Sequence, residues 1–546
     1  MRNLRRMFMF LGVLMSTLAI GLGFAQPRPS AAQPNQFVPV EDRWRLLWPL
    51  AGRPNPANPY QQNVLKGDFP ILGQHTFFVF TGIGDTLVEF RQLPIPAGIS
   101  TERPGSATFF GDDAQFFVRQ TILLRFELFE GDTAFRPLDW LLAISPAFNI
   151  NHLDVRERGI VNPDVRDGTE RTRTDIALQE AFFEYHLANV SKRYDFVSIK
   201  LGIQLFNSDF RSLMFNDTNL ASRLFGTLAN NRFQYNLTFF NMLEKDTNSE
   251  LNTFGMRDQQ IAIANLYWQD FIWLGYTAQF SIHYNRDEAT RHFDDNDFLV
   301  RPDPSGSFTP HEINVVYMGW TSDGHIGRLN VTHALYWALG HDDHNPLAGR
   351  SVDINAQMVA LELSVDFDWL RPKLSFLWTS GDRDPEDGTA TGFDTILDRP
   401  NFAGGGFSFW NRQGVRLLGV GLNQRESLIP NLRSSKIEGQ VIFVNPGLLL
   451  FHAGLDIEVT PKLRSFFNAS YLRFANPEPV EVFLQQPGIG HDIGFDISVG
   501  VFYRPLLNNN IVITGGVAAF VPGQGFENAL TSGVLYQGFV NLNLTF

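Results

Sequence analysis

Charged side chains recur on the polar side of several segments in which apolar and polar residues alternate. Successive side chains of a strand point to opposite faces, so these charges would share one face of a sheet. Both signs are present, and facing pairs could create a transverse field that sorts solutes in an enclosed passage. The alternative is that the pairs only stabilise each other. The candidates are Arg119, Arg125, Glu127, Glu180, Glu184, Lys200, Glu362 and Asp366.

A run of glycines flanked by aromatic residues lies at 401–410. Glycine adopts backbone angles that other residues avoid, and aromatic rings can stack on sugar rings. The stretch is therefore our first candidate for a loop that narrows a lumen. An aromatic anchor at a membrane interface is the alternative. The candidate residues are Phe402, Gly404, Gly405, Gly406, Phe407 and Trp410.

Two short segments carry side chains that metals use as ligands. Asp382, Asp384 and Asp387 gather carboxylates beside a glycine and could bind a structural Ca²⁺ in an outer loop, although a solvated acidic loop is the favoured interpretation. The run 341–344, His-Asp-Asp-His, could bind zinc, but a surface turn after a strand is favoured. We predict no other cofactor.

Several functional classes are disfavoured by composition. The chain has no cysteine, which excludes disulfides, thiolate nucleophiles and Fe–S clusters. Its net charge of −13 argues against a nucleic-acid partner. There is no Gly-x-Ser-x-Gly, no His-Glu-x-x-His and no phosphate-binding loop, so we do not expect an enzyme. Of the 44 basic residues, 37 are arginine, whose planar charge suits carboxylates and sugar hydroxyls, although codon bias explains the excess equally well.

The N-terminus has the organisation of an export signal. Three arginines precede an apolar core that ends in Gly23-Phe24-Ala25, so residues 1–25 are expected to be a signal peptide. Residues 26–70 are rich in Pro and Asn and form an expected periplasmic arm or linker, since proline cannot donate to a sheet ladder. Residues 71–546 are the expected barrel.

Alternating segments longer than ordinary globular strands fill the rest of the chain. Their number, about eighteen with an error of two, and their length favour a closed transmembrane barrel over a soluble sandwich. The fold class is therefore all-β, an antiparallel transmembrane β-barrel of 16–20 strands. The predicted strands are 75–89, 115–130, 139–153, 175–187, 194–206, 231–243, 259–268, 274–284, 311–320, 327–339, 354–366, 373–380, 436–445, 447–459, 463–474, 491–503, 511–520 and 532–546.

The connections differ in length, as expected for short periplasmic turns and long outer loops. Short turns are predicted at 191–193, 445–447, 460–462 and 508–510, since Asn, Pro and Gly are suitable turn residues. Long polar loops are predicted at 154–174, 207–230, 285–310, 381–435 and 475–490. The stretch 381–435 is long enough to fold inward or to carry a short helix.

The last strand alternates and ends in Phe546, with Val540, Leu542 and Leu544 on the same face. A terminal Phe on such a strand resembles the signal read by the barrel-assembly machinery of the outer membrane. The last strand must pair with the first to remove the open edges of the sheet.

The chain resembles the alginate-export family of large outer-membrane barrels. The resemblance lies in Asp387–Asp394, Asn401–Gly405 and the closing run Gly454–Phe546, about a third of the chain. It implies an eighteen-stranded barrel that passes an anionic polysaccharide through an arginine-rich lumen. Because this chain is acidic overall, only the barrel and the passive-transport role are carried over.

These observations predict a protein of the bacterial outer membrane, in contact with its lipid, that lets small polar solutes or saccharides pass passively. A scaffold barrel that holds a partner protein is the alternative. A barrel-embedded hydrolase is a third possibility, which no motif supports.

Overall fold

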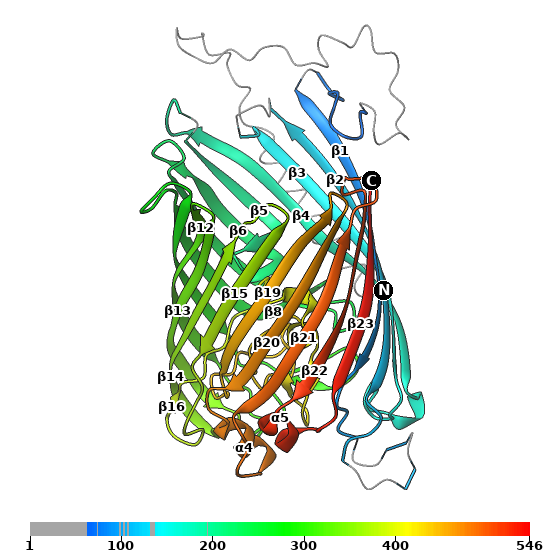
Figure 1. Cartoon of the computed structure of the whole chain (residues 1–546). Helices are drawn as coiled ribbons and strands as arrows, with labels where there is room; N and C mark the ends of the chain where they lie inside the picture. The colour runs from blue at the N-terminus through cyan, green and yellow to red at the C-terminus, as the bar shows by residue number, and fades with distance from the viewer. Residues whose placement is uncertain are drawn as a thin grey trace.

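The wall of the molecule is one closed sheet (Figure 1). The structure is a computed structural model that describes residues 63–73, 75–97, 100–101, 104–105, 109–131, 137–193 and 195–546. Within these residues, eighteen antiparallel strands each pair with the next one along the chain, and the last pairs with the first. The predicted all-β barrel of eighteen strands is thereby confirmed. The predicted signal peptide and residues 26–62 of the predicted arm lie outside the described residues.

The eighteen wall strands are 10 to 20 residues long. They are β1 (Thr76–Gln92), β2 (Ala114–Glu130), β3 (Trp140–Val155), β4 (Glu170–Asn189), β5 (Phe196–Asn207), β6 (Asn216–Leu228), β7 (Phe233–Lys245), β8 (Asn252–Trp268), β9 (Tyr276–Asp287), β12 (Ile313–Ile326), β13 (Leu329–Asn345), β14 (Arg350–Val365), β15 (Leu370–Thr379), β19 (Leu448–Thr460), β20 (Leu463–Phe474), β21 (Asp492–Tyr503), β22 (Ile511–Pro522) and β23 (Leu535–Thr545).

The outer face of the wall is apolar, as expected where strands meet acyl chains. On β9, Phe280 and Ile282 point outward and are exposed, whereas Gln279, Ser281 and His283 point inward and are buried. The same alternation places a large exposed apolar side chain on nearly every wall strand. A closed barrel satisfies all its backbone hydrogen bonds within the sheet, so it can cross a bilayer. Within the described residues no helix is long and apolar enough to cross a membrane.

The first strand reaches beyond its closing partner. Pairing between β1 and β23 stops at Ile83 and Thr545, so residues 76–82 have no wall strand on that side. The end of the N-terminal arm covers this edge: the Phe80 N–H donates to the Leu65 carbonyl at 2.8 Å, and the Lys66 ammonium lies 4.0 Å from the ring centre of Phe546. An edge that would otherwise be free to pair with another chain is thus protected.

The two ends of the barrel differ. One end has short turns such as 327–328, 366–369 and 461–462, and Phe546 lies there. The other end has the longest connections and the short helices. Besides the wall, the elements are η1 (Val165–Asp167), β10 (His292–Phe293), β11 (Leu299–Arg301), β16 (Thr389–Ala390), η2 (Gly405–Phe407), α3 (Phe409–Arg412), β17 (Val415–Arg416), β18 (Gly421–Asn423), α4 (Glu478–Leu484) and α5 (Gln524–Ala529).

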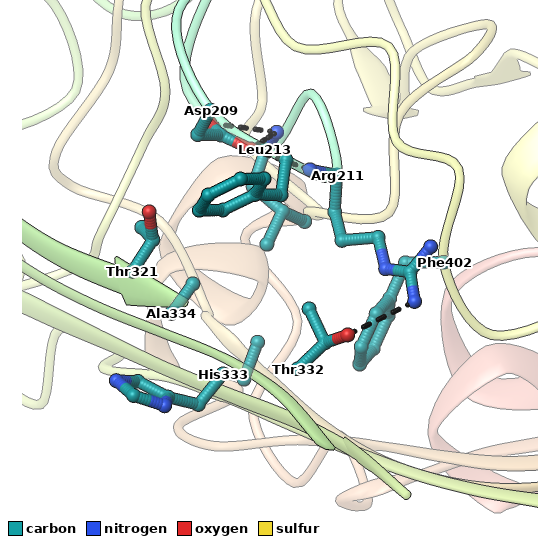
Figure 2. Close-up of a pocket in the computed structure, with 10 residues that line it drawn as sticks. Asp209, Arg211, Leu213, Thr321, Thr332, His333, Ala334 and Phe402 are labelled. Carbon is teal, nitrogen blue, oxygen red and sulfur yellow. Dashed lines mark hydrogen bonds between the residues drawn. The ribbon is translucent and has the colours of Figure 1, made fainter. Parts of the chain in front are cut away.

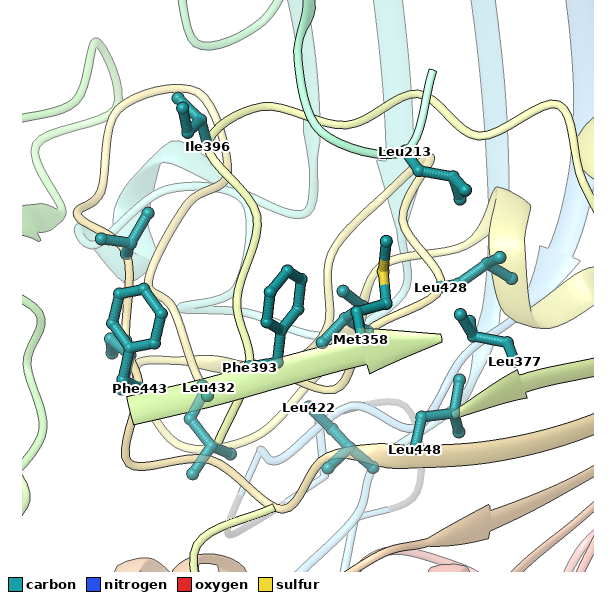
Figure 3. Packing of buried hydrophobic residues seen from close by; sticks show 14 of the residues in the cluster. Leu213, Met358, Leu377, Phe393, Ile396, Leu422, Leu428, Leu432, Phe443 and Leu448 are labelled. Carbon is teal, nitrogen blue, oxygen red and sulfur yellow. The ribbon is translucent and has the colours of Figure 1, made fainter. Parts of the chain in front are cut away.

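Residues 380–447, here called the inserted segment, fold into the barrel. They contact inward-facing residues of strands far apart around the wall: the Gln413 side chain reaches Glu89 of β1, the Ile437 carbonyl accepts from Arg257 of β8, and the main-chain N–H of Trp410 donates to Asp496 of β21. Figure 3 shows apolar residues of this segment packed against wall residues, including Met358 and Leu377. One side of the lumen is therefore a hydrophobic core.

Three sequence predictions about elements are wrong. No strand forms at 436–445, because its apolar run Val441–Val444 is buried on all sides within the inserted segment. The predicted loop 207–230 contains β6, whose outward face is interrupted by Thr218 and Ser222 and so lacks clear alternation. Residues 445–447 end the inserted segment at the long-connection end and are not a turn of the opposite end.

Candidate functional site: the charged lumen

The predicted charges on β2 and β4 face the lumen and pair with one another. Arg125 lies 2.8 Å from Glu127 and 2.7 Å from Glu180, which also accepts a hydrogen bond from the Ser145 hydroxyl. Arg119, further along the same face, lies 3.4 Å from Asp85 of β1. The side chain of Arg125 remains 30% exposed, so this network is in contact with solvent and is not sealed in the wall.

Two further predicted charges belong to the lumen and one does not. Lys200 of β5 lies 3.2 Å from Glu184 of β4, and Glu362 of β14 accepts from Arg211 at 2.7 Å. Asp366 instead lies in the turn after β14, at the short-turn end, where it pairs with Arg371. The alternation that put Asp366 on the lumen face is correct up to Val365, where the strand stops.

Arg211 connects the wall with the inserted segment. It lines a small pocket of about 10 Å³ together with Phe402 of the inserted segment and Thr332 of β13 (Figure 2). Its guanidinium donates to the Thr332 hydroxyl at 3.0 Å, and Asp209 stabilises the turn that contains Arg211 by accepting the N–H of Leu213 at 3.0 Å. The pocket has room for no more than a water molecule, so Phe402 acts here as packing.

The predicted constriction residues lie inside the barrel. Phe407 packs against Phe466 of β20 at 4.8 Å between ring centres and against Phe539 of β23 at 6.0 Å. Trp410 of α3 is fully buried and donates to the Leu428 carbonyl at 2.7 Å. The turn before α3 has Gly404 and Gly405 at φ values of +89° and +52°, which glycine adopts without strain, and Gly406 follows in η2.

An arginine cluster that the sequence analysis missed faces β1 from the inserted segment. Arg412 lies 2.5 Å from Glu89 and its guanidinium stacks 3.6 Å from the ring centre of Phe539. Arg91, two residues along β1, reaches the same carboxylate at 3.1 Å, and Arg425 stacks on Phe117 at 5.3 Å. Five arginines between 399 and 433, in a stretch predicted to be a loop, were the available sequence signal.

Arg425 also belongs to a second group of charges, with Arg399, Glu426 and Glu250. Arg399 lies 3.6 Å from Glu426 and 3.4 Å from Glu250, and Arg425 lies 3.8 Å from Glu250. Enclosure raises the pKa of Glu426, but Arg399 and Arg425 outweigh that effect and lower it to about 2. The Arg399 and Glu426 side chains stay 40% and 42% exposed, so these charges face solvent within the barrel.

The predicted metal ligands do not converge in the way that was expected. Asp382 is buried, which raises its pKa to about 6, whereas Asp384 and Asp387 are exposed. Among the described residues, a group of ligand atoms within 4.8 Å of one another occurs instead at His311, Asp342 and Asp343. The run 341–344 lies within β13 and not in a loop after it, and His341 points to Asp353 at 2.9 Å, away from that group.

Comparison with known protein families finds no match, and comparison with curated proteins finds none either. Solved structures of similar shape include OccK9 (OpdG) of Pseudomonas aeruginosa, with 11% identity, a TM-score of 0.48 and coverage of 86% of this chain and 98% of that one. The outer membrane protein opdK of the same species has 10% identity, a TM-score of 0.45 and coverage of 85% and 99%. OccAB4 of Acinetobacter baumannii has 12% identity, a TM-score of 0.43 and coverage of 85% and 98%. At these levels the function of this chain has to be inferred from its own geometry.

Proposed function

We propose that this protein is an outer-membrane channel through which small polar solutes or saccharides pass passively. The observation that carries the proposal is the presence of two groups of charged side chains inside the barrel. One is the network on β2, β4 and β5, and the other is the arginine and glutamate groups on the inserted segment. Both keep solvent-exposed side chains inside a closed barrel with an apolar exterior. Charges inside a lumen sort solutes by their local field.

The inserted segment limits the size of what can pass. Its apolar side packs in one cluster with residues of β5–β8, β12–β15 and β19–β23, which leaves the side toward β1–β4 for a hydrated path. A narrow polar path beside a packed core fits small solutes or single saccharide chains better than bulky cargo.

The proposal also covers the export of the protein to the outer membrane and its relation to the alginate-export barrels. Residues 1–25 would direct export and be removed, residues 26–70 would remain as a periplasmic arm, and the strand ending in Phe546 would be read by the assembly machinery. The relation to alginate-export barrels is supported by the residues quoted above. In the structure two of its motifs, Asp387–Asp394 and Asn401–Gly405, lie in the inserted segment. The proposed activity is transport and not catalysis.

Planar-bilayer recording of the purified protein tests the proposal. We expect stable open steps, and liposome swelling by small neutral sugars. Replacing both Arg399 and Arg425 by Gln should shift the reversal potential in a salt gradient toward cation selectivity. Arg286→Gln, at an exposed pair with Glu312 on the outward face of β9, is the matched control and should leave selectivity unchanged.

The packed interior also favours the scaffold alternative in one respect, because a barrel that only holds a partner needs no open path. A silent bilayer and impermeable liposomes, obtained with protein that is folded by circular dichroism, would overturn the channel and favour the scaffold.

A further inference from the structure

The outer wall carries a cavity at the end where the long connections lie. Its volume is about 450 Å³, and Trp378 of β15, Leu449 of β19 and Arg473 of β20 line it side by side in the sheet register. Arg383 of the inserted segment forms its rim. Leu377, Leu450 and Leu472, the chain neighbours of these wall residues, are buried in the interior, so the three lining side chains point outward.

The side chains below the cavity follow the order of a lipid leaflet. Nearest the middle of the wall, Leu374 is 64% exposed. Next comes an aromatic row, in which Phe376 and Phe451 lie 5.3 Å apart and Tyr471 lies 4.9 Å from Phe495. The cavity with its arginines comes last. Aromatic belts occupy the border of the hydrocarbon layer, so the cavity lies at headgroup depth.

Both arginines of the cavity have free guanidinium groups. Arg383 and Arg473 are exposed, and neither forms an ion pair within the described part of the chain. Asp492, the register partner of Arg473, interacts with the Tyr471 hydroxyl. A guanidinium offers a planar fork that matches two phosphate oxygens, and two forks beside an aromatic wall form a phosphate-binding arrangement.

We propose that this cavity binds the phosphorylated headgroup of a lipid in the leaflet at the long-connection end. Arg383 and Arg473 contact the phosphate, Trp378 packs against the headgroup, and the acyl chains descend along Phe376 and Phe451. The site anchors the barrel at a fixed depth, at the end of the wall where α4 follows β20 (Figure 1). It rests on the proposed location in the outer membrane but not on conduction, because every lining side chain named here lies outside the lumen.

Titration of the purified protein in detergent micelles, followed by native mass spectrometry, tests the site. The probes are a phosphorylated diglucosamine lipid, the same lipid without phosphate, and inorganic phosphate as competitor. The Arg383→Gln/Arg473→Gln double variant should lose about tenfold or more in affinity for the phosphorylated lipid. The control is Arg371→Gln/Arg464→Gln, which also removes two arginine charges but does so at the short-turn ends of β15 and β20, far from the cavity.

The proposal is supported if only the cavity variant loses the phosphorylated lipid, and if an excess of inorganic phosphate does not displace that lipid. Equal retention by the cavity and control variants overturns it. So does equal binding of the lipid without phosphate, or displacement by inorganic phosphate. A last outcome also overturns the proposal: a chelator releases the phosphorylated lipid from the unmodified protein, while the cavity variant still binds the lipid without chelator. Bridging cations, and not the two arginines, would then hold the phosphate. The channel proposal is tested by bilayer recordings of the unmodified protein. Its failure can therefore be told apart from a failure of the lipid-binding proposal, which only the titration tests.

Discussion

At the scale of single residues, the buried charge of Glu89 holds the inserted segment against strand β1 of the wall. Its side chain is 1% exposed, and Arg412, Arg91 and Gln413 all contact it. Removing one partner from a buried ion pair leaves charge without compensation, whereas removing both leaves none. Arg412→Gln should therefore lower the free energy of unfolding by about 2 kcal/mol.

Urea unfolding in micelles measures this loss. A double-mutant cycle with Glu89→Gln should give a coupling of about 1–3 kcal/mol. Strict additivity of the two variants would show that Glu89 and Arg412 do not interact in solution.

Gly500 and Gly516 face each other on β21 and β22 and make room for Phe407. A Cβ at Gly500 would lie 2.2 Å from the Phe407 ring, and one at Gly516 would lie 2.9 Å from it. Gly500→Ala should destabilise the barrel by about 1–3 kcal/mol because the ring must move, and Phe407→Ala in the same chain should restore part of the loss. Gly538→Ala is the control, since its nearest neighbour would be 3.7 Å away. Equal melting temperatures for Gly500→Ala and Gly538→Ala would refute this packing.

At the scale of elements, Glu157 ties two connections of the long-connection end together. The carboxylate accepts from the Ser100 hydroxyl at 2.5 Å, from the Thr101 N–H at 2.6 Å and from the Asp112 N–H at 2.6 Å. Burial raises its pKa, but these hydrogen bonds outweigh burial and lower it from 4.5 to about 2. The pKa is lower in the folded state, so the stabilisation is fully present above pH 4.5 and is lost as the pH falls toward 2.

Limited proteolysis with an acid-active protease should therefore cut within residues 156–169 increasingly between pH 4.5 and pH 2. In Glu157→Gln the same cut should be fast and independent of pH over this range. A wild-type chain that resists cleavage equally at both ends of the range would contradict the role of Glu157.

At the scale of the whole molecule, the inserted segment sets how much of the barrel is open. The Asp382 N–H donates to the Asn445 carbonyl at 2.9 Å, so a short Gly-Ser linker can replace residues 383–444 without stretching the wall. Conductance should rise several-fold, because the packed side of the lumen is removed. Unchanged conductance would mean that the path does not pass beside this segment.

A second variant keeps this test independent of whether the shortened chain folds. Asp394 and Arg433 form a buried pair at 2.7 Å inside the inserted segment. Asp394→Asn should loosen the segment and produce fluctuating open steps, whereas Glu312→Gln, at the exposed pair with Arg286 on the outer face of the wall, should not.

The candidate site was predictable only where it lies on the wall. Arg119, Arg125, Glu180 and Lys200 are set inward by strand alternation, which is a local property of the chain. Arg412 and Arg425 lie in the inserted segment, which shows no regular alternation of apolar and polar residues. The sequence therefore does not indicate which wall strand these arginines contact. Phe407 was singled out for its neighbouring glycines, but its partners Gly500 and Gly516 are about a hundred residues away.

By itself, the sequence determined the all-β barrel and its closure through the last strand. Its count of eighteen strands came out right because the false strand at 436–445 balanced the missed β6. The alternation of apolar and polar side chains is a local property that can be recognised directly in the sequence. Strands in a membrane can satisfy all their backbone hydrogen bonds only in a closed sheet. Tertiary structure alone decided that residues 380–447 turn inward and pack against β12–β15, because burial of an irregular segment depends on contacts between distant parts of the chain. It is those contacts that divide the lumen into a packed side and a charged one.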